Sequence, residues 1–123
     1  MSPVEFEKLV ADLFRENGFT VRSTREARDL GYDFAIDSPK HGGLILVEAK
    51  KMNRQSLVSV EAVRQLTVTI GAAGAMAAIL ISTSGFTSAA SALGAASSVA
   101  LRTLDDLLKA KSGEELSGVK KLG

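Results

Sequence analysis

The chain has 123 residues, and 15 Lys and Arg residues against 14 Asp and Glu residues leave a formal charge of +1. That length suits a single domain with its own buried core. Because cysteine is absent, a thiolate nucleophile, a disulfide framework and a cysteine-based zinc site are excluded. A net charge this small gives no general attraction for nucleic acid, so any such contact must depend on a local basic patch.

The start of the chain lacks the basic residues and apolar segment of a signal peptide, so we expect a cytoplasmic protein. A membrane span within Thr67–Phe86 is an alternative, because this stretch has no charged residue. It consists mainly of Ala, Gly, Ser and Thr with a short Ile/Leu run, a composition that does not favour a lipid-exposed helix. We therefore expect no membrane partner.

The first predicted element is a helix over Pro3–Asn17. Ser2 and Glu5 have the spacing of a capping box, and apolar residues recur after them at helical intervals. Gly18 suits the left-handed residue that ends many helices. The sequence therefore marks both ends of this helix.

Three strands follow the helix in the prediction. β-branched residues alternate over Phe19–Thr24, and Arg25–Gly31 is polar and typical of a turn. Tyr32–Asp37 is the second predicted strand, and Leu44–Lys50 is its hairpin partner. Because Leu44–Val47 is continuously apolar, we expect the third strand at the centre of the sheet, buried on both faces.

The second half of the chain alternates predicted helices and strands. We expect a helix over Val58–Ala72, a strand over Ala75–Ser82, a helix over Thr87–Ser97, a strand over Val99–Arg102 and a final helix capped by Thr103–Asp106. The order αβββαβαβα predicts an α/β fold with a central mixed β-sheet flanked by helices.

The predicted domain covers residues 1–110. Residues 111–123 combine Lys, Glu, Ser and Gly with few large apolar side chains. Such a composition cannot bury much apolar surface, so we expect a flexible tail or linker there.

Acidic and basic residues gather where the third predicted strand ends. Alternation along a strand puts the side chains of Glu48 and Lys50 on one face and that of Ala49 on the other. If Tyr32–Asp37 pairs antiparallel with this strand, Asp33 comes close to its polar end. We therefore predict that Asp33, Glu48 and Lys50 converge.

This set of groups suits hydrolysis of a phosphodiester. Two carboxylates and the Ala49 main-chain carbonyl offer oxygen ligands to Mg²⁺, with Mn²⁺ as a substitute. The cation would polarise a phosphate and activate a water, while Lys50 would stabilise negative charge or orient the water. The alternative is that Asp33, Glu48 and Lys50 form ordinary ion pairs at a sheet edge. Charges that directly follow a buried run need a partner or a purpose, which favours the first interpretation.

The spacing of these residues resembles a known family. Asp33 followed by Glu48-Ala49-Lys50 matches the Asp…(Glu/Asp)-x-Lys motif of the restriction-endonuclease-like nucleases. Between about Ser2 and Leu108 the chain resembles the catalytic domain of Mrr-type restriction endonucleases, in the segments Phe6-Glu7, Asn17–Val21, Asp29–Asp33 and Ser82–Ala90. Many Mrr-like members carry Gln where this chain has Glu48, so the chain is closer to the general nuclease motif.

The resemblance implies a restriction-endonuclease-like fold and Mg²⁺-dependent cleavage of DNA. It implies that Asp33 and Glu48 hold the metal and that Lys50 is the catalytic lysine. Glu7 matches a first-helix acid that lies near the metal in this family and in the similar archaeal Holliday-junction resolvases. Gln65 matches a polar position on the helix after the catalytic strand. The alternatives are a solvated helix acid at Glu7 and an exposed helix residue at Gln65.

Basic residues near the motif are candidate contacts to a DNA backbone. Lys51 and Arg54 follow the catalytic strand, and Arg28 lies in the predicted turn before Asp33, with Arg22 and Arg25 close by in sequence. The alternative is ordinary solvated loop charge.

Two other patterns are set aside. The single histidine, His41, lies in a Lys-His-Gly-Gly stretch that predicts a surface turn. Ser82, Ser84 and Thr87 offer hydroxyls without a base to activate them, and a helix cap explains Thr87. Neither pattern predicts chemistry.

DNA is the expected partner, and no small-molecule cofactor is expected. Cutting both strands needs two sites, so we expect a homodimer or a neighbouring catalytic or recognition domain. We predict a restriction endonuclease domain. Two alternatives remain open, namely a nuclease specific for four-way junctions and a DNA-binding or assembly domain that keeps the fold without cutting.

Overall fold

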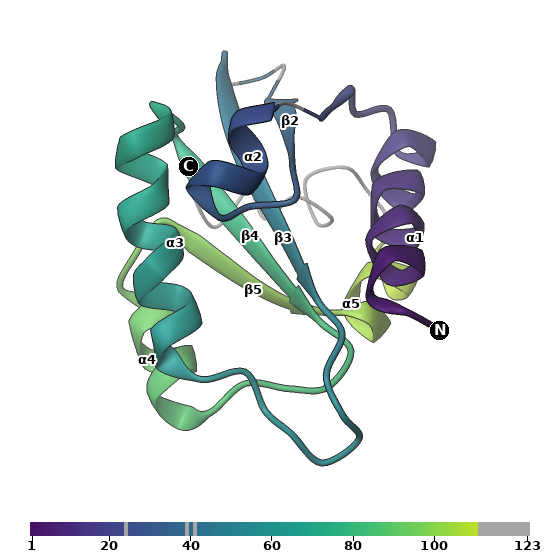
Figure 1. Ribbon diagram of the computed structural model, residues 1–123, viewed down its shortest axis with the longest axis vertical. Helices are drawn as coiled ribbons and strands as arrows, with labels where there is room; N and C mark the ends of the chain where they lie inside the picture. Colours follow the sequence, from purple (N-terminus) through teal and green to yellow (C-terminus); the bar gives the residue numbers. More distant parts are fainter. Residues whose placement is uncertain (24, 39, 41, 111–123) are drawn as a thin grey trace.

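The computed structural model describes residues 1–23, 25–38, 40 and 42–110, which form one sheet with helices on both faces (Figure 1). The predicted tail at 111–123 and the predicted turn residue His41 lie outside the described residues. In chain order the elements are α1 (Pro3–Glu16), β1 (Val21–Arg22), α2 (Arg25–Leu30), β2 (Phe34–Ser38), β3 (Gly43–Lys50), α3 (Val60–Ala73), β4 (Ala77–Ser82), α4 (Ser88–Ala95), β5 (Val99–Thr103) and α5 (Leu104–Lys109).

The sheet is mixed, as the sequence predicts. Its strand order is β1-β2-β3-β4-β5. The pairs β1–β2 and β2–β3 are antiparallel, and the pairs β3–β4 and β4–β5 are parallel. The third strand occupies the centre, and Ile45, Leu46 and Val47 are fully buried there. The continuous apolar run therefore has the position expected for a strand covered on both faces.

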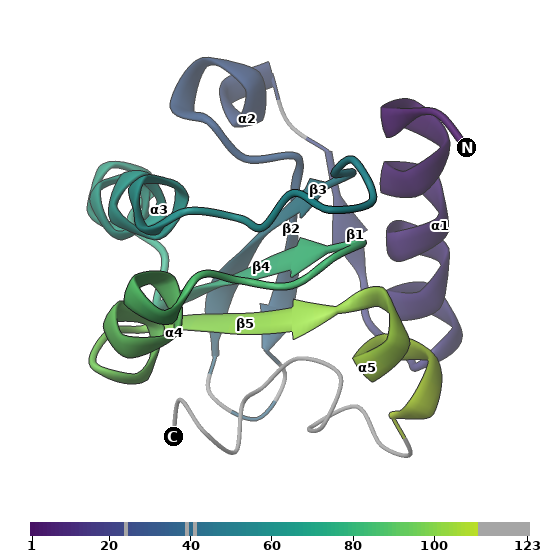
Figure 2. The ribbon, with the colours of Figure 1, turned by 90° about the horizontal axis from the view of Figure 1, so that it is seen from below.

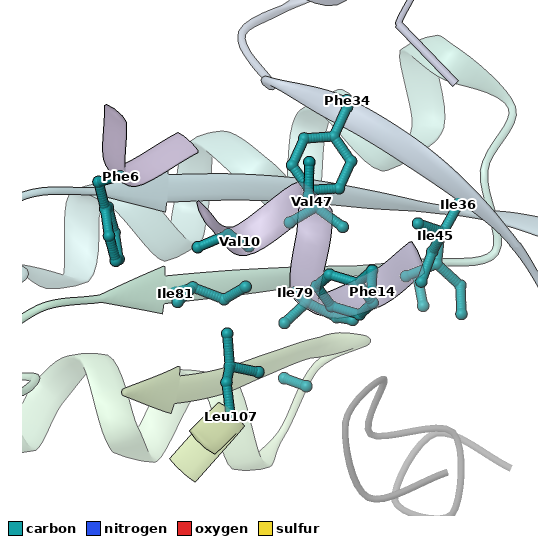
Figure 3. Close-up of a cluster of buried hydrophobic side chains, with 13 residues drawn as sticks. Phe6, Val10, Phe14, Phe34, Ile36, Ile45, Val47, Ile79, Ile81 and Leu107 are labelled. Carbon is teal, nitrogen blue, oxygen red and sulfur yellow. The ribbon is translucent and has the colours of Figure 1, made fainter. Parts of the chain in front are cut away.

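Helices lie on both faces of the sheet (Figure 2). On each face, an apolar core fills the space between the sheet and its helices. One core lies between the sheet and α1 with α5, and the other lies under α2, α3 and α4. Successive β3 residues point into opposite cores, since Val47 belongs to the first core and Leu46 to the second. In the first core Phe14 of α1 meets Phe34 of β2 edge to face, with ring centroids 6.1 Å apart (Figure 3).

The helix boundaries follow their sequence signals. The Ser2 side chain accepts the Glu5 N–H and the Glu5 carboxylate accepts the Ser2 N–H, which completes the predicted capping box of α1. Thr103 and Asp106 form the same reciprocal pair at α5. Gly18 has a φ of 87°, in the left-handed region that a glycine reaches without strain. These three predictions are confirmed.

The stretch between β1 and β2 differs from the prediction. The polar segment expected to be a turn forms α2, so the observed order is αβαββαβαβα, where αβββαβαβα was predicted. Ala27 is buried against the α3 layer, and the Thr69 hydroxyl of α3 donates to the Leu30 carbonyl at 2.9 Å. The partners in these contacts are distant along the chain, so the local polar composition of the segment does not indicate a helix. The first strand is also shorter than predicted.

The alternative of a membrane span within Thr67–Phe86 has no support in the part of the chain that the structure describes. Among the described residues, no helix has both the length and the apolar character needed to cross a bilayer. The uncharged stretch Thr67–Phe86 is divided between the end of α3, all of β4 and the turn after it.

Two apolar residues of α3 should differ strongly in how much they contribute to the free energy of unfolding. Leu66 is fully buried, whereas Val68 is 73% exposed. Leu66→Ala should lower the free energy of unfolding by about 2–5 kcal/mol, because it leaves a cavity under the helix. Val68→Ala should change it by less than about 0.5 kcal/mol. Urea unfolding measures both values, and equal losses would contradict the packing described.

Candidate active site

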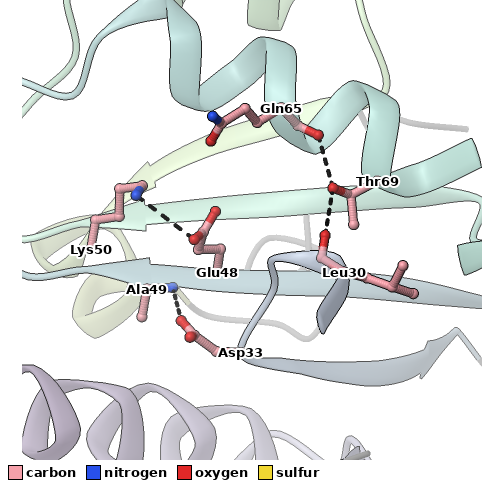
Figure 4. A network of polar contacts seen from close by, with 7 residues as sticks. All are labelled: Leu30, Asp33, Glu48, Ala49, Lys50, Gln65 and Thr69. Atoms are coloured by element: carbon pink, nitrogen blue, oxygen red, sulfur yellow. Dashed lines mark hydrogen bonds and ion pairs between the residues drawn. The ribbon is translucent and has the colours of Figure 1, made fainter. Parts of the chain in front are cut away.

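Asp33 is held directly against the central strand. It lies one residue before β2, and its N–H donates to the Val47 carbonyl at 2.9 Å. Its Oδ2 accepts the Ala49 N–H at 2.6 Å (Figure 4). The antiparallel register pairs Phe34 with Val47, so the next step outward brings Asp33 opposite Glu48. The predicted approach of Asp33 to the polar end of β3 is therefore present.

Glu48 and Lys50 share the face of β3 that looks toward α3. The Lys50 Nζ lies 3.7 Å from the Glu48 Oε1, as alternation along the strand predicts (Figure 4). The Glu48 side chain is 21% exposed and that of Lys50 is 35% exposed. The pair thus sits at the rim of the sheet, accessible to a substrate and partly removed from water.

Burial disfavours the charged forms of both strand-end acids. Burial raises the pKa of Asp33, while the Ala49 N–H and the Lys50 charge act in the opposite direction. Burial also raises the pKa of Glu48, the Lys50 ammonium lowers it, and the Asp33 charge raises it again. A bound cation would favour the charged forms of both acids.

Glu7 of α1 belongs to the same electrostatic cluster. Its side chain is half-buried, and burial followed by the Asp33 charge raises its pKa. The Arg28 guanidinium of α2 lowers that pKa. The first-helix acid is therefore near Asp33, as expected. The approach of Arg28 to Glu7 carries no signal in the sequence, because the segment that contains Arg28 has the polar composition of a turn.

Gln65 lies on the opposite side of β3 from α1. It is an exposed residue of α3, and in Figure 4 its amide extends toward the side on which Glu48 and Lys50 lie. Its main-chain carbonyl accepts the Thr69 hydroxyl at 2.9 Å. With Arg28 it lines a groove of about 360 Å³ between α2 and α3. The structure puts Gln65 beside the cluster without a direct contact to Glu48 or Lys50.

The basic residues separate into two groups. Lys51 and Arg54 are exposed on the connection between β3 and α3, and Arg28 is exposed on α2. Arg22 instead pairs with Asp37 of the neighbouring strand at 3.1 Å. The first three remain candidate contacts to a polyanion, whereas Arg22 already has a partner.

The oxygen donors suit a hard divalent cation. The Ala49 N–H points at Asp33, and because the N–H and C=O of one strand residue point the same way, its carbonyl faces that side as well. Among the described residues, no three His, Cys, Asp or Glu side chains are grouped as a metal site. Two carboxylates with a main-chain carbonyl still fit Mg²⁺, which binds one or two carboxylates and keeps several waters.

Because the pKa of Glu48 is raised, replacing this residue with a neutral one should stabilise the fold at neutral pH but not at acidic pH. A carboxyl whose pKa is higher in the folded than in the unfolded protein stabilises the fold at pH values below its ordinary pKa of 4.5. This contribution is lost as the pH rises through the pKa of the folded state. Glu48→Gln should therefore raise the Tm at about pH 7, and the gain should vanish near about pH 4. Calorimetry at both pH values, with exposed Glu16→Gln as control, measures the difference. A gain that grows on acidification would contradict the desolvation.

The fold is similar to those of three solved structures, two of which are restriction endonucleases. The structure is similar to AspBHI, a DNA modification-dependent restriction endonuclease, with a TM-score of 0.69 and 21% identity over 96% of this chain and 34% of that one. The crystal structure of a protein of unknown function is similar with a TM-score of 0.71 and 14% identity. That match covers 97% of this chain and 67% of the other. MspJI restriction endonuclease, solved with a 27-mer oligonucleotide, is similar with a TM-score of 0.51 and 19% identity. That match covers 97% of this chain and 27% of MspJI.

At these identities the three structures show a shared fold, and the chain spans about a third of AspBHI. No match is found among curated proteins. A family model described as restriction endonuclease, for the Mrr catalytic domain, matches residues 1–110. The chain therefore belongs to the Mrr-type restriction endonuclease family.

Proposed function

We propose that this domain hydrolyses DNA phosphodiester bonds with a divalent cation, Mg²⁺ or Mn²⁺, held by Asp33 and Glu48. The observation that carries the proposal is the convergence of two partly buried carboxylates and one ammonium at the end of β3. The Ala49 main-chain carbonyl is the third protein ligand in this proposal. A surface ion pair would need no second acid and no burial.

Each group has a role in the proposed reaction. When bound, the cation polarises the phosphate and acidifies a water. Asp33 and Glu48 would hold the cation. The hydrogen bond from the Ala49 N–H fixes the Asp33 carboxylate in place. Lys50, which offsets the Glu48 charge, stabilises the negative charge that develops on the phosphate and orients the attacking water. Glu7 adds a carboxyl beside Asp33, and Gln65 offers an amide from α3.

Restriction of foreign or modified DNA is the proposed biological role. AspBHI is described as DNA modification-dependent, and this chain matches about a third of it. We therefore propose that target selection depends on an adjacent recognition domain or partner. Concerted cutting of both strands requires two sites, which a homodimer or a second catalytic domain would supply.

The first test of the proposal is cleavage of plasmid DNA. Asp33→Asn, Glu48→Gln and Lys50→Ala should each lower the single-turnover rate at least about 10²–10³-fold, because each removes charge from the site of reaction. EDTA should abolish cleavage by the intact domain. Asp105→Asn, which removes an exposed acid paired with Lys109 on α5, should cleave normally.

Full activity of the three site variants would overturn the site assignment. The same assay separates the alternatives. Symmetric cutting of a four-way junction in preference to linear DNA would indicate a resolvase, and metal-independent binding without any cutting would indicate a non-catalytic domain. Concerted double-strand breaks by a single-site domain that stays monomeric on the DNA would contradict assembly from separate chains.

Metal binding should also stabilise the fold directly. A ligand at about ten times its dissociation constant adds about 1.4 kcal/mol to the free energy of unfolding. Millimolar Mg²⁺ or Mn²⁺ should therefore raise the Tm by several degrees, and Glu48→Gln should lose most of this shift. Thermal unfolding with and without the cation makes the measurement, with Asp105→Asn as the control. An equal shift in Glu48→Gln would mean that the cation binds elsewhere.

A further inference from the structure

The connection between β3 and α3 begins at the candidate active site and projects from the sheet. Residues 51–59 follow Lys50 directly, and Figure 1 shows this connection reaching beyond the ends of the strands. Lys51, Asn53, Arg54 and Gln55 are exposed on it. Among the described residues, none of these four side chains makes a hydrogen bond or an ion pair. The loop thus presents free polar groups beside the site.

The main chain of this loop is nevertheless held firmly. The Thr83 hydroxyl accepts the Met52 N–H at 2.8 Å and donates to the Met52 carbonyl at 3.4 Å. The Thr83 N–H donates to the Lys50 carbonyl at 3.2 Å. Further along, the Ser84 hydroxyl donates to the Ser56 carbonyl. The segment after β4 therefore fixes the loop just after Lys50 and again near its far end.

A second set of bonds closes the base of the loop. The Val58 N–H donates to the Gly85 carbonyl and the Thr87 N–H donates to the Val58 carbonyl, both at 3.0 Å. The buried Ser82 hydroxyl lies 3.2 Å from the Ser84 hydroxyl and accepts the Ser84 N–H at 3.0 Å, which braces the segment that holds the loop. A loop whose main chain is already anchored loses little main-chain entropy when it binds a partner.

The charge of the loop identifies the class of partner. From Lys50 to Val60 there are three basic residues and no acid. Lysine and arginine bind phosphates of a nucleic-acid backbone, and the side-chain amides of Asn53 and Gln55 carry the donor and acceptor pair that base edges recognise. A DNA duplex seated on Lys50 would continue onto this loop.

We propose that residues 51–57 are a preformed DNA-binding loop beside the nuclease site, and that Thr83 is its positioning residue. Lys51 and Arg54 contact backbone phosphates, and the Thr83 hydroxyl holds the turn that aims them. The inference rests on the proposed function, because it takes DNA to be the substrate. Its test uses binding in EDTA, which requires no cleavage.

Binding of a short labelled duplex in EDTA tests the two cations. Lys51→Ala and Arg54→Ala should each weaken binding about 3–10-fold and lower the slope of log affinity against log salt by about 1. Arg15→Ala is the matched control, because Arg15 is exposed near the far end of α1 and pairs with Asp12 at 3.0 Å. Unchanged affinity and slope in both loop variants would overturn the proposal.

A second series tests the positioning role of Thr83. Thr83→Val keeps the shape but removes the hydroxyl, so it should weaken binding about 3–10-fold and speed hydrogen exchange at the Met52 N–H, whereas Thr83→Ser should restore both. Ser97→Ala is the control, because Ser97 bonds the Val99 N–H at 3.3 Å at the opposite end of the sheet. Equal loss in Ser97→Ala, or no rescue by Thr83→Ser, would overturn the role of Thr83.

These results separate the two proposals. If the intact domain binds DNA through Lys51 and Arg54 but never cuts with Mg²⁺ or Mn²⁺, the loop stands and the hydrolytic function fails. If the domain cuts DNA while both loop variants bind normally, the function stands and the loop proposal fails. Binding of the loop to an acidic protein in preference to DNA would also overturn the proposal.

Discussion

The hydrogen bond from the Ala49 N–H to the Asp33 carboxylate joins the two segments on which the site depends. Asp33 lies outside β2, yet its own N–H also bonds to β3 through Val47. The antiparallel pairing is thereby extended one residue past the strand, to the point where the apolar core ends. The Asp33 side chain therefore links the register of the β2–β3 hairpin to the relative positions of the two acids. A shift of this register by one residue would move Asp33 away from Glu48.

At neutral pH the charged acids of the candidate site destabilise the fold. Burial raises the pKa values of Asp33, Glu48 and Glu7, and one ammonium beside the first two offsets this effect only partly. Groups that disfavour their own ionisation favour a bound cation, which compensates the charge without further burial. Such a conflict between stability and activity is common where a function requires partly buried charges.

The two segments that follow β3 and β4 act as one unit at the end of the sheet. Parallel strands end at the same edge, so the chain after Lys50 and the chain after Ser82 meet there. Hydroxyls of Thr83 and Ser84 bond to the main chain at Met52 and Ser56, and the β4 connection thereby supports the loop next to Lys50. In Figure 1 these connections project from the edge where the site lies. The sheet edge thus combines the proposed chemistry with a candidate surface for DNA.

Features that depend on near neighbours could be predicted from the amino-acid sequence alone. Alternation in β3 placed Glu48 and Lys50 on one face, the run Leu44–Val47 marked the central strand, and local caps marked the ends of α1 and α5. The remaining features could not be predicted in this way, because they depend on contacts between residues that are distant in the chain. Helix α2 depends on contacts with α3, and the bond between Thr83 and Met52 spans 31 positions. Arg28 and Glu7 likewise lie on segments that are distant in the chain. No local pattern encodes such contacts, since each forms only when the sheet has brought its two segments together.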